Sequence, residues 1–243
     1  VYRIDRKSNE EDYEKAFNPF ITSSLDTDIS LNSSFRNTLF FNQSSPKFGV
    51  DISYQNIRNV SLLVNGIDER GNIFQEMRVR WNLNRAFSWN VAVKQGVKSF
   101  DSEFFETRDY NISYLETEPR LTYQPNTAFR LSLSYKYSSK DNTVSFQLAE
   151  MHNVGASLKY NILNKGSLNV TANFIDVTYN DVQNTSLAFE MLEALQIGEN
   201  ITWTVRYQRN ISKNMQLSLN YEGRQSSGAN VVHIGGAQVR AYF

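Results

Sequence analysis

Apolar and polar residues alternate with a period of two along much of this chain. Between residues 129 and 138, every odd position holds Phe, Leu or Tyr, and every even position holds Arg, Ser or Lys. On a helix, residues two positions apart point about 200° apart, whereas on a strand they share one face. The alternation therefore predicts β-strands with one apolar and one polar face. It recurs in the segments 77–83, 89–93, 201–207 and 217–221.

Short and long connections take turns between the predicted strands. Turn residues mark short turns near 84–85, 125–127, 164–166 and 212–214, with a slightly longer one at 43–48. Longer polar links are expected at 57–73, 97–109, 181–199 and 225–233, with a tight turn at Ser139–Asn142 where a long loop is due. Outer-membrane barrels combine short periplasmic turns with long external loops in this way. We therefore predict an all-β fold, an antiparallel transmembrane up-and-down β-barrel.

The chain ends on an alternating segment, 237–243, which we predict to be the last strand of the barrel. We expect its Ala237, Val239, Ala241 and Phe243 to form the barrel-insertion signal. If Phe243 is periplasmic, counting back makes 29–41 an inward strand, and Val1–Lys7 is the candidate for the outward strand before it. The count gives about 12 strands if the chain closes on itself, and more if further strands precede it.

The composition excludes several other classes of protein. The chain has 25 basic and 25 acidic residues, so there is no electrostatic case for binding nucleic acid. It has no Cys, which excludes a disulfide scaffold and a thiolate metal site. No apolar run approaches the roughly 20 residues of a transmembrane helix. A soluble β-sandwich remains an alternative, although it would need neither a terminal Phe strand nor connections that alternate in length.

Two segments depart from the period of two. In 186–196, Leu187, Met191, Leu192 and Leu195 are spaced by three and four residues, which predicts a short helix in an external loop. Glu10–Ala16 is charged and is a candidate helical turn in the first loop. The simpler interpretation of both is a loop that packs on its own barrel. The more specific interpretation is a partner-docking surface, formed in 186–196 by its four apolar residues.

The candidates for chemistry are few. His152 shares a strand face with Glu150, but Ser157 falls on the other face, so a hydrolase site at His152 is the weaker interpretation. His233 is expected in or near the last loop. No cluster has metal-ligand spacing and no phosphate loop is present, so we predict no metal, no cofactor and no catalytic residue.

Four arginines on polar strand faces are candidates for lining the barrel interior. They are Arg78, Arg80, Arg130 and Arg206. Such residues select anions in an open pore. Alternatively they pair with Glu76, Glu118 and Glu222 in a filled interior, which we favour because side chains can largely fill small barrels.

Three blocks of the chain resemble outer-membrane proteins of Bacteroidota, of the flavobacterial kind. Residues 195–243 resemble the C-terminus of those proteins. Residues 32–55 (NSSFRNTLFFNQSSPKFGVDISYQ) and 118–142 (EPRLTYQPNTAFRLSLSYKYSSKDN) resemble further blocks. The resemblance implies a C-terminal barrel of a longer polypeptide and supplies no catalytic residues. Because Val1 is not a start Met, we expect a mature or partial product, with 1–243 as one barrel domain.

These observations predict a non-enzymatic protein of the bacterial outer membrane. The first expectation is a structural or anchoring subunit of a cell-envelope complex for export, assembly or surface display, with outer-membrane lipid and other proteins as partners. The alternative is a channel or transporter for small solutes, and an outer-membrane hydrolase is less favoured.

Overall fold

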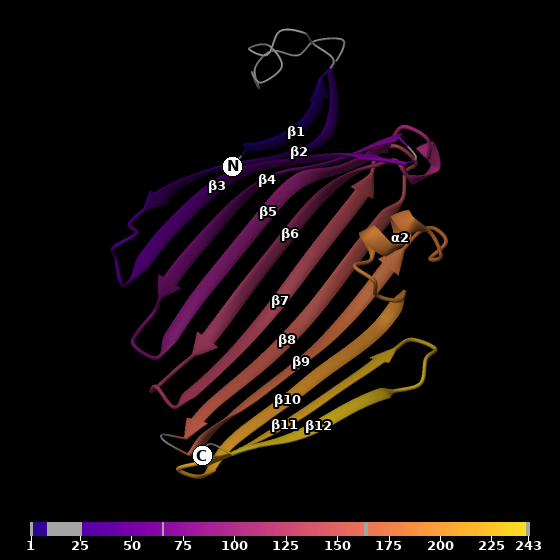
Figure 1. The fold of residues 1–243 in the computed structure, drawn as a ribbon. Helices are drawn as coiled ribbons and strands as arrows, with labels where there is room; N and C mark the ends of the chain where they lie inside the picture. The colour runs from indigo at the N-terminus through magenta and orange to yellow at the C-terminus, as the bar shows by residue number, and fades with distance from the viewer. Residues whose placement is uncertain (1, 9–25, 65, 163–164, 242–243) are drawn as a thin grey trace.

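The computed structural model describes residues 2–8, 26–64, 66–162 and 165–241. In these residues the chain forms one antiparallel sheet of twelve strands, each paired with its neighbours in sequence (Figure 1). The strands are β1 (Tyr2–Ser8), β2 (Asp26–Phe41), β3 (Phe48–Leu63), β4 (Gly66–Asn82), β5 (Phe87–Ser102), β6 (Tyr110–Tyr123), β7 (Phe129–Asn142), β8 (Leu148–Ile162), β9 (Gly166–Tyr179), β10 (Gly198–Ser212), β11 (Met215–Ser226) and β12 (Val232–Ala241).

In the described residues, helical structure occurs only in the connections between strands. The single 3-10 turn η1 (Glu106–Arg108) follows β5, and the six-residue helix α2 (Ser186–Met191) lies between β9 and β10. No helix in the described part of the chain is long and apolar enough to cross a membrane. The predicted helix at 186–196 is therefore present but shorter, whereas Glu10–Ala16 lies outside the described residues.

Successive connections lie at opposite edges of the sheet. At one edge, which we call the short-turn end, lie 42–47, 83–86, 124–128, 163–165 and 213–214. At the other edge, the long-connection end, lie 64–65, 103–109, 143–147, 180–197 and 227–231. Figure 1 shows the short turns along the left of the sheet and α2 on the right. The predicted alternation of short and long connections is therefore present only in part: the 180–197 connection is long, but the connection between β3 and β4 is as short as that between β10 and β11, and 42–47 is longer than 143–147.

Several predicted links at the long-connection end were wrong in extent. Strands β3 and β4 fill almost all of 57–73, and β7 continues through Ser139–Asn142 to a connection at 143–147. Strands β2 to β5 have 16 or 17 residues, more than the roughly 10 that cross a bilayer. Polar residues enter both faces of these extensions, as Arg58 and Asn59 do in β3. Because the apolar face ends there, the sequence of these extensions lacks the alternation of a strand and was interpreted as loop.

Large apolar side chains cover one face of the sheet, which we call the apolar face. Trp81, Trp89, Leu121 and Leu133 lie side by side on it, because each is paired with the next across β4 to β7. They are 40–50% exposed. An exposed apolar area of this size would be a liability in water, but it suits the lipid-facing surface of a barrel.

The opposite face, the polar face, carries the alternate residues of each strand. Arg120 and Ser134 are paired on it across β6 and β7, and Ser134 is paired with Gly155 of β8. The buried apolar cluster of the chain also lies on this side, under α2. In a barrel this face lines the interior.

The sheet in Figure 1 is curved and open, with β1 and β12 on opposite sides. No pairing between β12 and β1 is present among the described strands. Strand β1 pairs only with the Asp26–Ser33 part of β2. The predicted first strand Val1–Lys7 is therefore present as β1, although the structure does not pair it with the last strand.

Candidate functional site

The most organised site lies where the 180–197 connection folds over the polar face. Ala188 and Met191 of α2, with Leu192, have 0–2% exposed area. They pack on strand residues that share the long-connection end of β6, β8 and β9. The whole group, which we call the loop-docking cluster, comprises Ile112, Ala149, Met151, Ile175, Val177, Ala188, Met191 and Leu192.

Local sequence explains why α2 forms there. Thr185 is the N-cap, with extended backbone angles, and its hydroxyl accepts a hydrogen bond from Ala188 N at 3.0 Å. This cap satisfies one of the free N–H groups at the helix start. A six-residue helix is too short to be stable alone, so its packing on the sheet must hold it.

Three lysines of the polar face bind this connection. Lys140 is 8% exposed and donates to Met191 O and Glu193 Oε1, both at 2.9 Å. Lys98 forms an ion pair with Glu190. Lys136 lies 3.8 Å from Glu193 and 3.2 Å from the strand residue Glu116. A small polar cavity of about 160 Å³ lies among these groups.

The environment of Glu193 favours its ionised form. Burial alone would raise the pKa of this carboxyl, but the charge and hydrogen bond of Lys140, together with Lys136 and Lys98, lower the pKa below its ordinary value. The pKa of Asp181, in the same connection, is also lowered, because its carboxylate accepts hydrogen bonds from the Gln147 side chain and Val182 N. The connection is therefore pinned by charge as well as by apolar packing.

The predicted partner-docking residues point mainly into the protein. Met191 and Leu192 are buried in the loop-docking cluster, and Leu187 and Leu195 pack against it. This packing fits the interpretation of a loop that packs on its own barrel, and it takes Met191 and Leu192 out of any contact with a partner in this structure, whereas Leu187 and Leu195 are only partly buried. The exposed apolar side chain of α2 is instead Phe189, at 66%.

Phe189 is one of several exposed apolar side chains at the long-connection end. Phe104 in 103–109 is 66% exposed, and Phe146 in 143–147 is 81% exposed. Phe146 O accepts a hydrogen bond from the Asn180 side chain at 3.3 Å, which ties 143–147 to the connection that carries α2. The sequence interpretation missed these residues, because single Phe residues in polar loops carry no periodic signal.

The four predicted interior arginines all lie on the polar face. Arg78 donates to Glu76 at 2.7 Å, and Arg206 to Glu222 at 3.3 Å, as in the paired alternative. Arg80 instead donates to the backbone oxygens of the 42–47 turn. Glu118 pairs with Arg120 rather than with Arg130, for which no ion pair is recorded within the described residues.

Both histidines lie on the apolar face, each beside a tyrosine. The hydroxyl of Tyr135 is 2.7 Å from His152 Nδ1, and that of Tyr221 is 2.8 Å from His233 Nδ1. His233 is the second residue of strand β12 and so lies near the last loop, as expected. The β8–β9 register runs without a bulge, which keeps Ser157 on the opposite face from His152. No nucleophile–base pair forms there.

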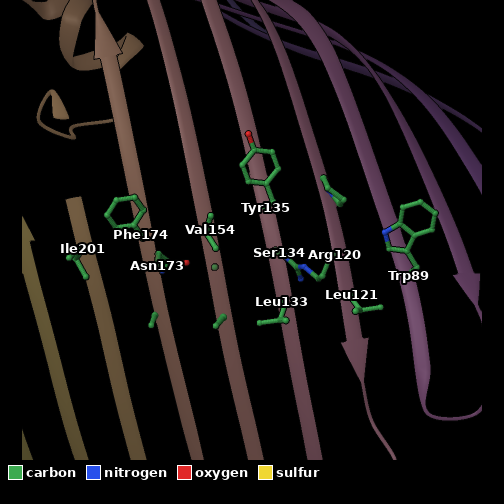
Figure 2. A pocket seen from close by; sticks show the side chains of 14 residues that line it. Trp89, Arg120, Leu121, Leu133, Ser134, Tyr135, Val154, Asn173, Phe174 and Ile201 are labelled. Carbon is green, nitrogen blue, oxygen red and sulfur yellow. The ribbon is translucent and has the colours of Figure 1, made fainter. Parts of the chain in front are cut away.

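A hollow of about 610 Å³ lies on the apolar face between β5 and β10. Figure 2 shows Trp89, Leu133, Val154 and Phe174 around it. The hollow exists because small residues such as Ala156 stand among large ones. Its lining is mainly apolar, and the hydroxyl of Tyr135 is already bonded to His152. The hollow therefore suits contact with lipid chains.

The described residues include no group of three or more His, Cys, Asp or Glu that could hold a metal ion. In the last strand, Ala237 and Val239 lie opposite Leu219 and Leu217 on the apolar face. Phe243, the end of the predicted insertion signal, lies outside the described residues. Its role stays a prediction.

Comparison with known proteins supports the architecture. No protein-family model matches the chain, and no curated protein matches it in sequence. Among solved structures it is similar to CdiB from Acinetobacter baumannii, with 13% identity and a TM-score of 0.52 over 90% of this chain and 46% of that one. The chain thus spans about half the length of CdiB.

Two further solved structures match with lower TM-scores. The β domain of the Bordetella autotransporter BrkA has 11% identity and a TM-score of 0.40, over 88% of this chain and 91% of that one. The NanC porin has 10% identity and a TM-score of 0.39, over 88% and 94%. The predicted fold class is confirmed: the chain has the antiparallel up-and-down fold of outer-membrane β-barrels, and the predicted outer-membrane location agrees with it.

Proposed function

We propose that this chain is a structural, anchoring subunit of a cell-envelope complex, held in the bacterial outer membrane by its apolar face. The observation that carries the proposal is the set of exposed phenylalanines at the long-connection end: Phe104, Phe146 and Phe189. They lie on neighbouring connections beyond the ends of the strands. Exposed apolar groups on connections of this kind mark binding to another protein.

The covered polar face supports the same proposal. The loop-docking cluster and Lys140 hold the 180–197 connection over this face. Two interior arginines are neutralised by carboxylates. A permanently open pore would need a hydrated, uncovered interior, so an anchoring role fits the geometry better.

A site-specific photo-crosslinker tests the proposal in intact cells. Placed at Phe146 or Phe189, it is expected to give discrete protein adducts that survive purification. The matched control is Leu83, 51% exposed at the short-turn end. Adducts at Leu83 alone, or none at either Phe position, would contradict docking at the long-connection end.

A gated channel is the second candidate, because Arg78 and Arg206 keep 58% and 63% of their side-chain areas exposed on the polar face. Planar-bilayer recordings of the intact chain and of a variant lacking 181–196 distinguish the two roles. A gated channel should show a conductance that rises when the connection is removed. If neither protein conducts ions, the channel role is excluded.

We assign no enzymatic role to the chain. The motivating geometry is the separation of His152 from Ser157, which lie on opposite faces of β8. Lipid hydrolysis by the purified protein that disappears in His152→Ala would overturn this assignment.

A further inference from the structure

A groove of about 750 Å³ runs across three neighbouring turns at the short-turn end. It is lined by parts of 42–47, 83–86 and 124–128, and we call it the turn groove. These turns are adjacent because β3 pairs with β4 and β5 pairs with β6. The sequence interpretation treated them only as connections.

The walls of the turn groove are braced by hydrogen bonds. Asn82 N donates to Lys47 O at 2.7 Å, and Gln124 N to Ala86 O at 2.6 Å, so each turn is tied to the next. Within the middle turn, Asn84 Oδ1 accepts from the N–H groups of Ala86 and Phe87 at 2.8 Å. The groove is therefore largely preformed, and binding there costs little ordering.

Positive charge dominates the groove. Lys47 and Arg85 line it, and no Asp or Glu does. Neither cation forms an ion pair with any described residue. The five short connections contain no acidic residue at all in the sequence. A Lys and an Arg beside one groove, both free of carboxylates, match an anionic phosphate group.

The groove also borders the apolar face. Leu83 and Phe87 line it and are 51% and 37% exposed. The ring of Phe87 lies 4.6 Å from that of Tyr123, and Trp81 lies next to Trp89 at 6.3 Å, all near this end. Aromatic residues in this position mark the boundary between lipid chains and headgroups. A ligand with an anionic head and apolar chains would contact both the cations of the groove and its apolar border.

We propose that the turn groove binds an anionic phospholipid headgroup, with Lys47 and Arg85 contacting its phosphate and with the acyl chains passing over Phe87 onto the apolar face. An acidic peptide is the competing occupant, but it would leave the apolar border unused. The proposal does not depend on the docking role given to the long-connection end.

Tryptophan quenching in detergent micelles tests it on the full chain. Trp203→Phe leaves Trp81 and Trp89, which flank the groove residues Asn82 and Ser88, as reporters. The probes are phosphatidylglycerol and phosphatidylcholine with the same dibrominated acyl chains. Phosphatidylglycerol is expected to quench at lower concentration. Each cation contributes about a fivefold preference, so Lys47→Gln/Arg85→Gln is expected to reduce the preference by roughly 25-fold.

The matched control is Lys165→Gln/Lys213→Gln, which removes the same charge from short connections outside the groove. It is expected to keep the preference, and heat-modifiable gel migration checks that both variants are folded. Equal quenching by the two lipids in the parent protein overturns the proposal, as does an equal loss in both variants. Binding of hexaglutamate that requires Lys47 and Arg85, without any lipid preference, would show a peptide site instead.

Discussion

Met191→Ala is expected to release the 180–197 connection from the polar face. Met191 is completely buried in the loop-docking cluster, and its backbone oxygen accepts the hydrogen bond from Lys140. Truncating a buried Met to Ala costs about 2–5 kcal/mol. Because a surface loop can settle into part of the vacated space, we expect about 2–3 kcal/mol, or a ~30- to ~140-fold shift from docked to undocked loop.

A spin label at Phe189→Cys measures this shift directly. Phe189 is exposed, so the label reports loop mobility without disturbing the cluster. The Met191→Ala background is expected to add a mobile component to the spectrum. Val182→Ala, at a 65% exposed position of the same connection, is the control and is expected to change nothing.

A second variant separates loop release from damage to the sheet. Met151 belongs to β8 and forms the strand side of the same cluster. Met151→Ala is expected to mobilise the label as well, with heat-modifiable migration unchanged in both variants. An immobile label in both backgrounds would refute the claim that apolar packing holds the connection.

Three further predictions follow from the same structure. The ionised Glu193 carboxylate, whose pKa is lowered by Lys140, stabilises docking at pH values above the ordinary carboxyl range. This stabilisation is lost as pH falls through the lowered pKa, so the label at Phe189 should loosen as pH falls below the ordinary carboxyl range, and Glu193→Gln should abolish that step. If β12 pairs with β1 in the membrane, Arg3→Cys should form a disulfide with a second cysteine introduced at position 236, 238 or 240, one position in each variant. A gel shift that a reductant reverses detects the disulfide, and its absence in all three variants excludes the pairing. Arg80→Ala should loosen the 42–47 turn by removing its bonds to Gln43 O and Ser45 O, seen as faster cleavage there by a protease; an unchanged cleavage rate would show that the turn holds without them.

The strands were predictable wherever one face meets lipid. The odd residues of 129–138 must all be apolar because they share the apolar face, and β7 begins at Phe129 as the alternation predicts. Beyond the apolar belt this constraint ends. Arg58 forms an ion pair with Glu69 of β4 on the apolar-face side of the sheet. Because polar residues stand on both faces there, the sequence pattern did not show that β3 and β4 continue.

The site was not predictable from local patterns. Alternation places Lys136 and Lys140 on one face, but it says nothing about what meets them there. Glu193 lies 53 residues further along the chain, and only the folding of the 180–197 connection onto the polar face brings it within 2.9 Å of Lys140. The spacing of Leu187 and Met191 predicted a helix but not the side on which it packs.

Closure of the sheet requires more than its two end strands. In lipid, an open strand edge leaves N–H and C=O groups unsatisfied, so β1 and β12 must both find partners there. Strand β12 runs antiparallel to β1 and can pair with it, but β1 covers only Asp26–Ser33 of β2. The next residues, Phe35–Phe41, present side chains such as Leu39, 70% exposed. Because β12 runs parallel to β2, an antiparallel barrel needs another strand segment along Phe35–Phe41, even if β12 pairs fully with β1.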